Sequence, residues 1–403
     1  MNKKEVKKAP TLRFKGFTND WEQRKLGEIA KVIGGGTPST KNSDYWNGNI
    51  NWYSPTEIGK SNYIFTSKKK ITKLGLENSS AKILPGTHTI LFTSRAGIGN
   101  MAIMQTDGCT NQGFQSWVID NNTNIYFLYS LGSDLKKEAI RKASGSTFLE
   151  ISNKEVKKIP LSIPSKHEQD KLGKLFLVLD NLLSLHQRKL KLLRTLKSGL
   201  SFKLFNKKHL NNLSQISLDQ IGQTYSGLTG KSKKDFGHGH AFYVSYLNVN
   251  QNEIGNPKQI DRIEIDKKQN LVQKNDIFFT ISSETPEEVG LTSLWPVSCK
   301  NLYLNSFCFG FRINTKMFIP LYLGYLFRSE YFREKVLPLA QGISRYNLSK
   351  NNVLKIKIGQ EEIAIQEKYA KVMNDLDSDI LRQKKKVKEL KLCKKFLLQN
   401  MFI

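Results

Sequence analysis

Two parts of the sequence occur twice. The pattern of residues 26–37 returns in residues 218–229. A stretch with apolar residues at alternating spacings of four and three runs through residues 172–204 and returns in residues 369–401. An internal repeat of this length has to be explained before any local pattern, because each copy must fold into the same kind of unit. The sequence therefore predicts two similar domains, each followed by a long helix.

Each of the two long stretches carries a single apolar seam. Four-three spacing is typical of coiled-coil packing, and helices of this length extend about 50 Å. If the two helices pair antiparallel, a pseudo-two-fold closes and the polar residues His186 and Gln383 come near each other, where they can fix the register. The alternative is a surface helix that lies along its own domain. The seam residues expected to form helix and subunit interfaces are Leu172, Leu179, His186, Leu193, Leu376, Gln383 and Leu390.

The chain is strongly basic. Its 403 residues contain 63 Lys and Arg against 35 Asp and Glu, which gives a formal net charge of +28. This excess favours a polyanionic partner, most simply nucleic acid. A basic protein bound to a membrane surface is the alternative, although the charge is spread along the chain rather than gathered on one amphipathic face.

The cysteine pattern and the hydropathy favour a soluble protein. The four cysteines lack the spacing of disulfide frameworks or zinc-binding motifs, so reduced thiols are expected. The first ten residues contain no apolar run of the kind found in signal peptides, and apolar runs elsewhere are too short to span a bilayer. The sequence therefore predicts a cytoplasmic location.

The expected fold class is α/β of the mixed α+β kind. Short apolar runs at residues 89–92 and 117–119 predict strands, and residues 125–144 predict one helix. The second domain repeats the first with insertions, and Asn305 corresponds to Asn111. The predicted boundaries are a basic tail at residues 1–18, a first domain at 19–163, a helical spacer at 164–210, a second domain at 211–358 and a second helical spacer at 359–403. The two spacers are expected to form an antiparallel coiled coil that separates the domains.

No motif in the sequence predicts catalysis or a metal site. The Gly-Lys-Ser segment around Lys231 lacks the first glycine of a phosphate-binding loop, because that position is Tyr225. His238 and His240 have no nearby cysteine or carboxylate to complete a set of metal ligands. The Asp-Lys-Lys segment that begins at Asp266 resembles a nuclease motif without its second carboxylate. No Pro-Pro pair occurs, which excludes the Asn/Asp-Pro-Pro-aromatic motif of amino-methyltransferases.

Polar side chains in matched loops of the two halves are the candidates for contact with DNA. Arginine can grip guanine with two hydrogen bonds, and Asn or Gln can pair with adenine in the same way. For each residue the alternative is a turn residue that satisfies the local backbone. The candidates in the first half are Gly35, Thr37, Ser39, Lys41, Thr93, Ser94, Arg95, Asn111 and Gln112, and those in the second half are Ser226, Thr229, Lys231, Ser282, Ser283, Asn305, Arg345 and Tyr346.

Three segments together resemble the specificity subunit of type I restriction–modification enzymes. PTLRFKGF at residues 10–17 with WEQRKLGEI at 21–29 is similar to the start of that family's first target-recognition domain. Residues 145–152 with Ile159 and Pro160 resemble the end of that domain, and HQRKL at 186–190 with Leu193 resembles the central helix. The resemblance extends over essentially the whole chain. The second copy departs from the first in one loop, where residues 343–346 are ISRY against STFL at 146–149.

The resemblance implies a non-catalytic subunit with two target-recognition domains that each recognise one half of a bipartite DNA sequence. It implies that the paired helices set the spacing and dock two methyltransferase subunits, and that two ATP-dependent restriction subunits complete the complex. S-adenosylmethionine, ATP and Mg²⁺ would then belong to those partners, with no cofactor on this chain. Two alternatives remain open: a self-contained metal-dependent nuclease that uses Asp266 and Lys268, and a coiled-coil protein that binds nucleic acid without sequence preference.

Overall fold

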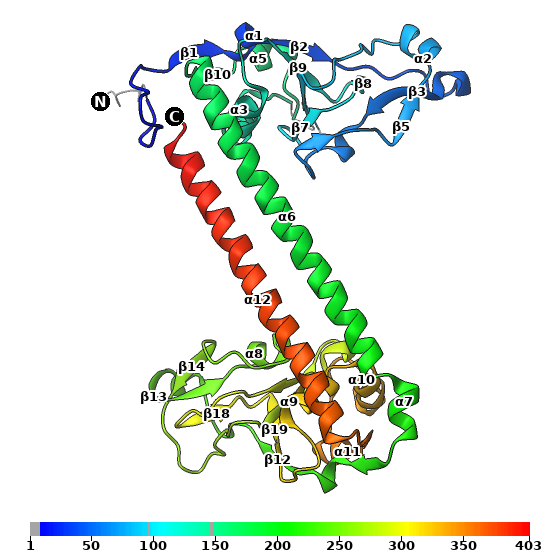
Figure 1. Ribbon diagram of the computed structural model, residues 1–403, viewed down its shortest axis with the longest axis vertical. Helices are drawn as coiled ribbons and strands as arrows, with labels where there is room; N and C mark the ends of the chain where they lie inside the picture. Colours follow the sequence, from blue (N-terminus) through cyan, green and yellow to red (C-terminus); the bar gives the residue numbers. More distant parts are fainter. Residues whose placement is uncertain (1–8, 96, 146–148) are drawn as a thin grey trace. The chain divides into compact units, whose positions relative to one another are not determined.

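The computed structural model describes residues 9–95, 97–145 and 149–403. It divides into two compact units, of which unit 1 comprises residues 1–187 and 385–403 and unit 2 comprises residues 188–384. Each unit contains a mixed α/β domain and parts of two long helices (Figure 1), so the predicted fold class is confirmed. The first eight residues of the predicted tail and residues 146–148 of the domain-end motif lie outside the described residues.

Unit 1 is built on two sheets and a two-stranded ribbon. The larger sheet has the order β2 (Ala30–Gly34), β9 (Gln115–Ile119), β6 (Thr89–Phe92), β7 (Met101–Met104) and β4 (Tyr63–Ile64). The smaller sheet has the order β5 (Lys69–Ile71), β3 (Trp46–Tyr53) and β8 (Gly108–Thr110), and the ribbon pairs β1 (Glu22–Lys25) with β10 (Pro160–Ile163). Its short helices are α1 (Leu26–Ile29), α2 (Lys73–Glu77), α3 (Ile125–Ser130), α4 (Gly132–Lys142) and α5 (Asn153–Lys157), with 3-10 turns η1 (Ser43–Tyr45) and η2 (Pro55–Glu57).

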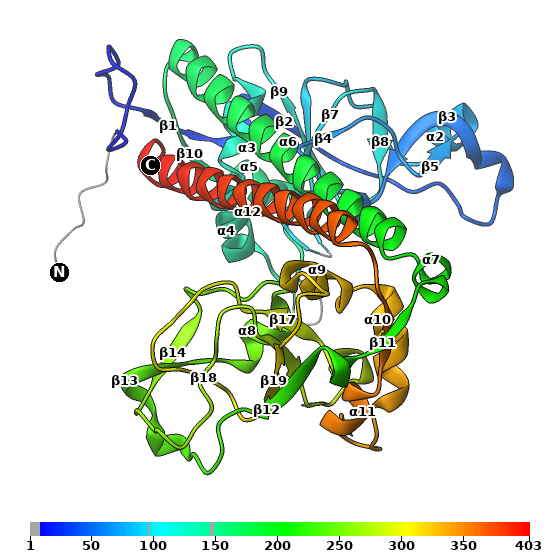
Figure 2. The same cartoon turned by 60° about the horizontal axis from the view of Figure 1, so that its bottom comes forward.

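Unit 2 repeats this architecture. Its larger sheet has the order β12 (Gly222–Ser226), β19 (Cys308–Ile313), β15 (Ile277–Thr280) and β17 (Thr292–Leu294), and its smaller sheet has the order β14 (Ile260–Ile263), β13 (Phe236–Val244) and β18 (Leu302–Leu304). Two ribbons pair β11 (Gln215–Ser217) with β21 (Lys357–Gly359) and β16 (Ser282–Ser283) with β20 (Tyr346–Asn347). Figure 2 shows the smaller sheet at the end of this unit that lies away from helices α10 and α11. The helices are α7 (Lys207–Asn212), α8 (Tyr246–Gln251), α9 (Pro320–Leu326), α10 (Glu330–Val336) and α11 (Lys350–Leu354), with 3-10 turns η3 (Leu218–Gln220), η4 (Lys233–Asp235), η5 (Pro286–Glu288) and η6 (Leu337–Leu339).

Hydrogen bonds align the two units residue by residue. Strands β2, β9, β6 and β7 occupy the same positions in their sheet as β12, β19, β15 and β17. Thr93, directly after β6, donates its hydroxyl to a carbonyl of the following loop at 2.7 Å, and Thr280, the last residue of β15, does the same at 2.7 Å. The structural repeat therefore extends to the sheets, although the sequences of the two halves differ there.

The predicted strands at residues 89–92 and 117–119 are confirmed as β6 and part of β9. The predicted single helix at residues 125–144 is wrong, because α3 ends at Ser130 and α4 begins at Gly132. Leu131 between them has ψ near −2°, well away from the helical value. A Cβ at position 132 would lie 3.2 Å from the Met101 sulfur, so glycine allows the turn to pack closely against β7. Apolar periodicity continues across this break, which explains the error.

The long helices are α6 (Lys166–Leu204) and α12 (Ile363–Asn400). Their buried and half-buried positions include the predicted seam. Within unit 1, Phe176 of α6 lies 5.2 Å from Phe402, just beyond α12, and Asp180 forms an ion pair with Lys394. Residue numbers therefore increase along α6 in the direction in which they decrease along α12. The pairing inside this unit is therefore antiparallel.

Unit 2 contains the same antiparallel pairing. Lys197 of α6 contacts Asp377 of α12 at 2.6 Å, and Phe205 lies 6.4 Å from Tyr369. His186 belongs to unit 1 and Gln383 to unit 2, so their predicted proximity stays a prediction.

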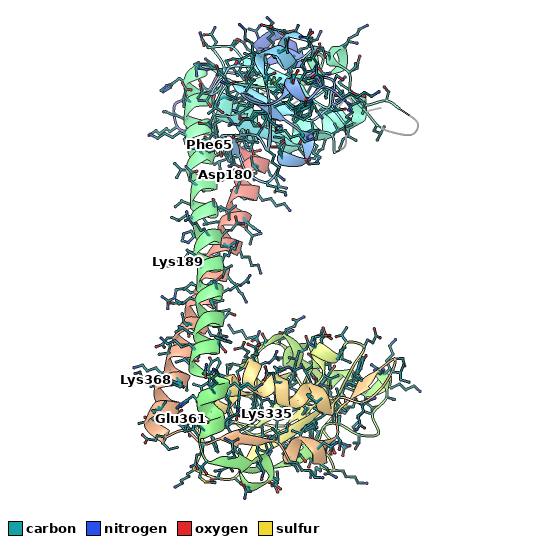
Figure 3. The ribbon with its side chains drawn as sticks, turned by 90° about the vertical axis from the view of Figure 1, so that its right-hand side faces the viewer. Phe65, Asp180, Lys189, Lys335, Glu361 and Lys368 are labelled. Atoms are coloured by element: carbon teal, nitrogen blue, oxygen red, sulfur yellow. The ribbon has the colours of Figure 1, made fainter. Side chains whose placement is uncertain are left out.

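An aspartate joins both long helices to the domain in each unit. Asp180, labelled on α6 in Figure 3, accepts a hydrogen bond from Tyr126 of α3 at 2.8 Å in addition to its ion pair with Lys394. In unit 2, Asp377 accepts from Tyr325 of α9 at 2.9 Å in addition to its ion pair with Lys197.

An aromatic residue completes each anchor. Phe402, directly after α12, packs against Trp21, Phe127 and Phe176 in the core of unit 1. Phe205, directly after α6, packs against Tyr322 in the core of unit 2. Each domain core thus includes the end of a long helix.

We predict that Asp180→Asn destabilises unit 1 by about 2 kcal/mol, because the neutral amide leaves Lys394 without its counter-charge in a largely buried setting. The measurement is the midpoint of urea unfolding followed by tryptophan fluorescence. Asp379→Asn is the matched control, since Asp379 pairs with Arg382 on the exposed helix surface and is expected to contribute less than about 0.5 kcal/mol. Equal midpoints for the two variants would contradict the role assigned to Asp180.

Candidate nucleic-acid interface

Three loops of unit 1 meet at one edge of its larger sheet, where the DNA-contact candidates were predicted. The loop after β2 is tied to the end of β8 by a hydrogen bond from Gly36 N to Thr110 O of 2.8 Å. The loop after β6 is tied to the next turn by Ser94 N to Gly113 O, also 2.8 Å, and Ile151 N donates to Ser94 O at 3.0 Å. These backbone bonds fix the edge independently of the side chains that it presents.

Unit 2 builds the same edge with the same bonds. Leu228 N donates to Leu304 O at 2.7 Å, Ile281 N to Phe307 O at 2.9 Å, and Leu348 N to Ile281 O at 2.9 Å. These bonds match Arg95 with Ser282. The loop after β15 is longer than the loop after β6, because the carbonyl that receives the threonine hydroxyl belongs to Glu288 in unit 2 and to Gly97 in unit 1.

A glycine allows the close approach of two loops in each unit. A Cβ on Gly35 would lie 1.9 Å from the carbonyl oxygen of Asn111, and a Cβ on Gly227 would lie 2.0 Å from that of Asn305. No side chain fits at either position, so Gly35 serves the geometry of the edge rather than a contact of its own.

The two predicted adenine-binding asparagines hold the turn. Asn111 Oδ1 accepts from Gly113 N at 2.8 Å, and Asn305 Oδ1 accepts from Phe307 N at 2.9 Å. Asn305 is 7% exposed and donates its amide to Val244 O at 3.0 Å, so its hydrogen-bonding groups are directed inward. Asn111 and Asn305 are therefore positioning residues.

Other candidates also lie beneath the surface. Thr93 is buried and bonded to its own loop, while the buried Ser94 hydroxyl has no hydrogen-bond partner among the described residues. Ser283 is 7% exposed and donates to Glu288 at 3.0 Å. Tyr346 is half-buried against the core of unit 2. The predicted edge is thus present, but these four side chains support it.

Only some of the candidate side chains of unit 1 reach the surface. Gln112 is exposed and accepts a hydrogen bond from the hydroxyl of Thr37. The Arg95 guanidinium lies 3.9 Å from the Glu150 carboxylate in an exposed pair that holds it weakly. Ser39 and Lys41 are exposed further along the first loop.

In unit 2 the loop after β12 is fixed by several side chains. Ser226 accepts from Lys350 at 2.5 Å, and Thr229 N donates to Gln269 at 3.0 Å. Lys231 forms a 2.7 Å ion pair with Asp266, which lowers the pKa of that carboxyl to about 2. The predicted lysine therefore has a carboxylate partner within the chain.

Asp266 was the residue of the nuclease alternative. Besides Lys231, its carboxylate accepts from Lys268 N at 2.9 Å and from the Gln269 amide at 3.1 Å. In the part of the chain that the structure describes, no group of three or more His, Cys, Asp or Glu side chains is placed to hold a metal ion. These contacts make Asp266 an anchor for the loop that contains Lys231.

A basic segment lies beside this loop. His238 sits between the Glu264 carboxylate, 3.0 Å from Nδ1, and the Lys234 carbonyl, 2.8 Å from Nε2. The Lys234 carbonyl and then Glu264 raise the pKa of His238, because both ring nitrogens can donate only in the charged form. The exposed lysines of this segment are Lys233, Lys234, Lys267 and Lys268.

The long helices present a second apolar face that the sequence analysis missed. The predicted interface residue Leu172 is 1% exposed, and the other predicted seam residues are buried or half-buried. Six large apolar residues of α6 instead remain on the surface, and five of them, all except Phe202, lie at heptad-like spacings that are visible in the sequence. These five are Val178, Leu182 and Leu185 in unit 1 and Leu192 and Leu196 in unit 2.

Comparison with known proteins finds a family model that matches the first part of the chain. Residues 18–195 match the model of the type I restriction modification DNA specificity domain. This part of the chain is similar to that family. It includes the first loop edge and the first four-fifths of α6.

Two relatives that the chain resembles are specificity subunits. The chain is 36% identical over 168 residues to the type I restriction enzyme MjaIX specificity subunit of Methanocaldococcus jannaschii, which is 41% of this chain and 39% of that protein. It is 29% identical over 170 residues to the EcoR124I/EcoR124II specificity subunit of Escherichia coli, which is 40% of this chain and 41% of that protein. The match thus spans about two fifths of the length of each relative.

Solved structures share the fold across both units. The type I restriction-modification S subunit from M. genitalium superposes with a TM-score of 0.65 at 16% identity, over 98% of this chain and 99% of that one. A chain from a study of type I restriction–modification complex assembly gives a TM-score of 0.51 at 13% identity, over 95% and 97%. Within residues 9–95, 97–145 and 149–403, no helix is both long and apolar enough to cross a membrane.

We predict that Gly35→Ala and Gly227→Ala each cost about 2 kcal/mol or more, because the new methyl group would overlap the backbone carbonyls of Asn111 and Thr110 in unit 1 and that of Asn305 in unit 2. Urea unfolding measures the loss. Gly199→Ala is the control: a Cβ there meets nothing within 4 Å, and alanine should strengthen α6 by about 0.5–1 kcal/mol. Wild-type stability of the two edge variants would show that the loops can separate freely.

We predict that the η4 segment loosens as the pH rises. The folded pKa of His238 lies above the ordinary value of 6.5, so its contribution to stability is fully present below about pH 6.5 and is lost as the pH rises through the folded pKa. Hydrogen-exchange protection of residues 232–238 should therefore fall as the pH rises above about 6.5. His238→Ala should abolish this dependence and His240→Ala should retain it; the reverse result would assign the effect to another group.

Proposed function

We propose that this chain is the sequence-specific DNA-recognition subunit of a type I restriction–modification complex, and that each unit recognises one half of a bipartite target. The observation that carries the proposal is the loop edge that is built twice. Its backbone bonds, its close-approach glycine and its asparagine turn are the same in both units, whereas the exposed side chains differ. A backbone that is the same in both units, with different exposed side chains, suits two domains that recognise different DNA sequences.

The exposed groups of each edge would contact the DNA. In unit 1 these are Thr37, Gln112 and Arg95, which offer hydroxyl, amide and guanidinium groups to base edges in the major groove. In unit 2, Arg345 lies at the same edge, whereas the hydroxyl of Ser282 is buried beneath it. The net charge of +28 supplies the attraction to phosphates, and binding should weaken steeply with salt.

The chemistry of the complex would reside on other chains. We propose that this subunit is non-catalytic, that two methyltransferase subunits supply S-adenosylmethionine binding, and that two restriction subunits supply ATP- and Mg²⁺-dependent cleavage. The exposed apolar residues of α6, from Val178 to Leu196, are the surface proposed for docking the methyltransferase subunits, since the seam residues are already covered. Such an assembly would work in the cytoplasm.

The length of the helices is proposed to set the spacing of the two half-sites. Helix α6 contains 39 residues and α12 contains 38, which corresponds to about 57 Å for each. Both helices belong in part to each unit. A ruler of fixed length should tolerate little change in the DNA between the half-sites.

The test begins with methylation mapping in cells with and without this chain, which identifies a dependent target. One base pair is then inserted between its half-sites, which shifts one half by about 3.4 Å and rotates it by about 35°. We predict at least a tenfold loss of affinity for the full chain with its methyltransferase partner, whereas the same insertion outside the target has no effect.

Three other outcomes would each contradict a different part of the proposal. Unchanged affinity after the insertion would contradict the proposal that the helices set the spacing of the half-sites. Equal binding of target and random duplex would favour nonspecific nucleic-acid binding. Cleavage of DNA by the purified chain with Mg²⁺, lost in Asp266→Ala, would favour the nuclease.

A further inference from the structure

A rigid hairpin stands beside the edge of unit 2. Gln341 and Asn347 exchange backbone hydrogen bonds of 2.9 and 2.8 Å, and β20 pairs with β16, which contains Ser282. Gly342 begins the tip with φ of +139°, a conformation that favours glycine. The base of the hairpin is therefore fixed, and residues 343–345 form a tip that projects from it.

The tip presents an apolar side chain next to a cation. Ile343 is 99% exposed, and the Arg345 guanidinium lies 5.9 Å above the ring of Phe307, which is 54% exposed. A single exposed apolar residue is ordinary on a protein surface. Here, however, an isoleucine, an arginine and a phenylalanine gather at the edge that we assign to DNA.

Unit 1 builds the same hairpin base with different chemistry. Ser144 and Glu150 exchange the matching hydrogen bonds, both 3.0 Å. The sequence has Ser146 at the position of Ile343, although Ser146 lies outside the described residues. The turn that contains Phe307 in unit 2 contains Gly113 in unit 1. At the position of Ile343 the second half thus has an apolar residue where the sequence of the first half has serine.

We propose that Ile343 is a wedge that inserts partly between two neighbouring base pairs of the half-site bound by unit 2, while Arg345 binds the adjacent phosphate. This inference rests on the proposed function and adds a local deformation of the DNA to it. Apolar side chains that enter a base step partly unstack it and kink the duplex. The hairpin supplies the support, Ile343 the wedge, and Arg345 the charge that compensates the bent backbone.

The experiment uses the full chain and duplexes that carry the target found by methylation mapping. 2-Aminopurine is placed in turn at each step of both half-sites, because its fluorescence rises when a base is unstacked. The wild-type chain should give a rise at one step of one half-site only. Ile343→Ser, which copies the residue of the first half, should abolish that rise and weaken binding about tenfold. Ile343→Leu should retain both.

Leu381→Ser provides a matched control, since Leu381 is a 69% exposed apolar residue on α12 and its loss should change neither signal. If the wild-type chain prefers its target over a scrambled duplex but no step unstacks, or if Ile343→Ser leaves the rise intact, the wedge is overturned while the proposed function stands. If the wild-type chain shows no preference for the target, the proposed function fails, and the wedge fails with it.

Discussion

The carboxylates of Asp180 and Asp377 hold each unit together. Each accepts a tyrosine hydroxyl from its domain and pairs with a lysine from the opposite long helix. Burial, with the neighbouring carboxylate, raises the pKa of Tyr126 and of Tyr325, so both hydroxyls remain donors at any physiological pH. The partners of each ion pair lie 214 and 180 residues apart in sequence, so neither unit is complete until α12 has been made. The domains and the helices therefore form as one structure.

In each edge, the residues that support the backbone differ from the side chains proposed to contact DNA. Gly35, Asn111 and their counterparts in unit 2 serve the backbone, and their chemistry is nearly identical in the two halves. The side chains at matched positions are free to differ because no backbone bond of the edge depends on them: Arg95 is matched by Ser282 without any loss of the hydrogen bonds on either side. A duplicated scaffold can thus acquire two specificities without two folds.

Periodicity in the sequence predicted the helices and the mixed α/β class, since four-three spacing requires a buried seam. It missed the break at Leu131, where the apolar pattern continues although the backbone turns. It also located the edge, because Gly35 and Asn111 repeat as Gly227 and Asn305. It did not show which side chains at the edge are exposed, since burial depends on loops far apart in the chain. The sequence offers no sign that an amide such as that of Asn305 is already bonded to Val244.

The two arginines at the edges show why aligned sequences fail there. Arg95 follows β6, and its Cγ lies 3.6 Å from where a Cβ on Gly113 would stand. Arg345 comes from the hairpin and lies over Phe307, which the backbone bonds match with Gly113. Each edge thus has an arginine beside the same turn, but the arginine comes from a different element in each unit. A sequence alignment of the two halves therefore does not pair Arg95 with Arg345. Under the proposed function, matching contacts of the two units are therefore found by position in space, and the backbone bonds of each edge identify them.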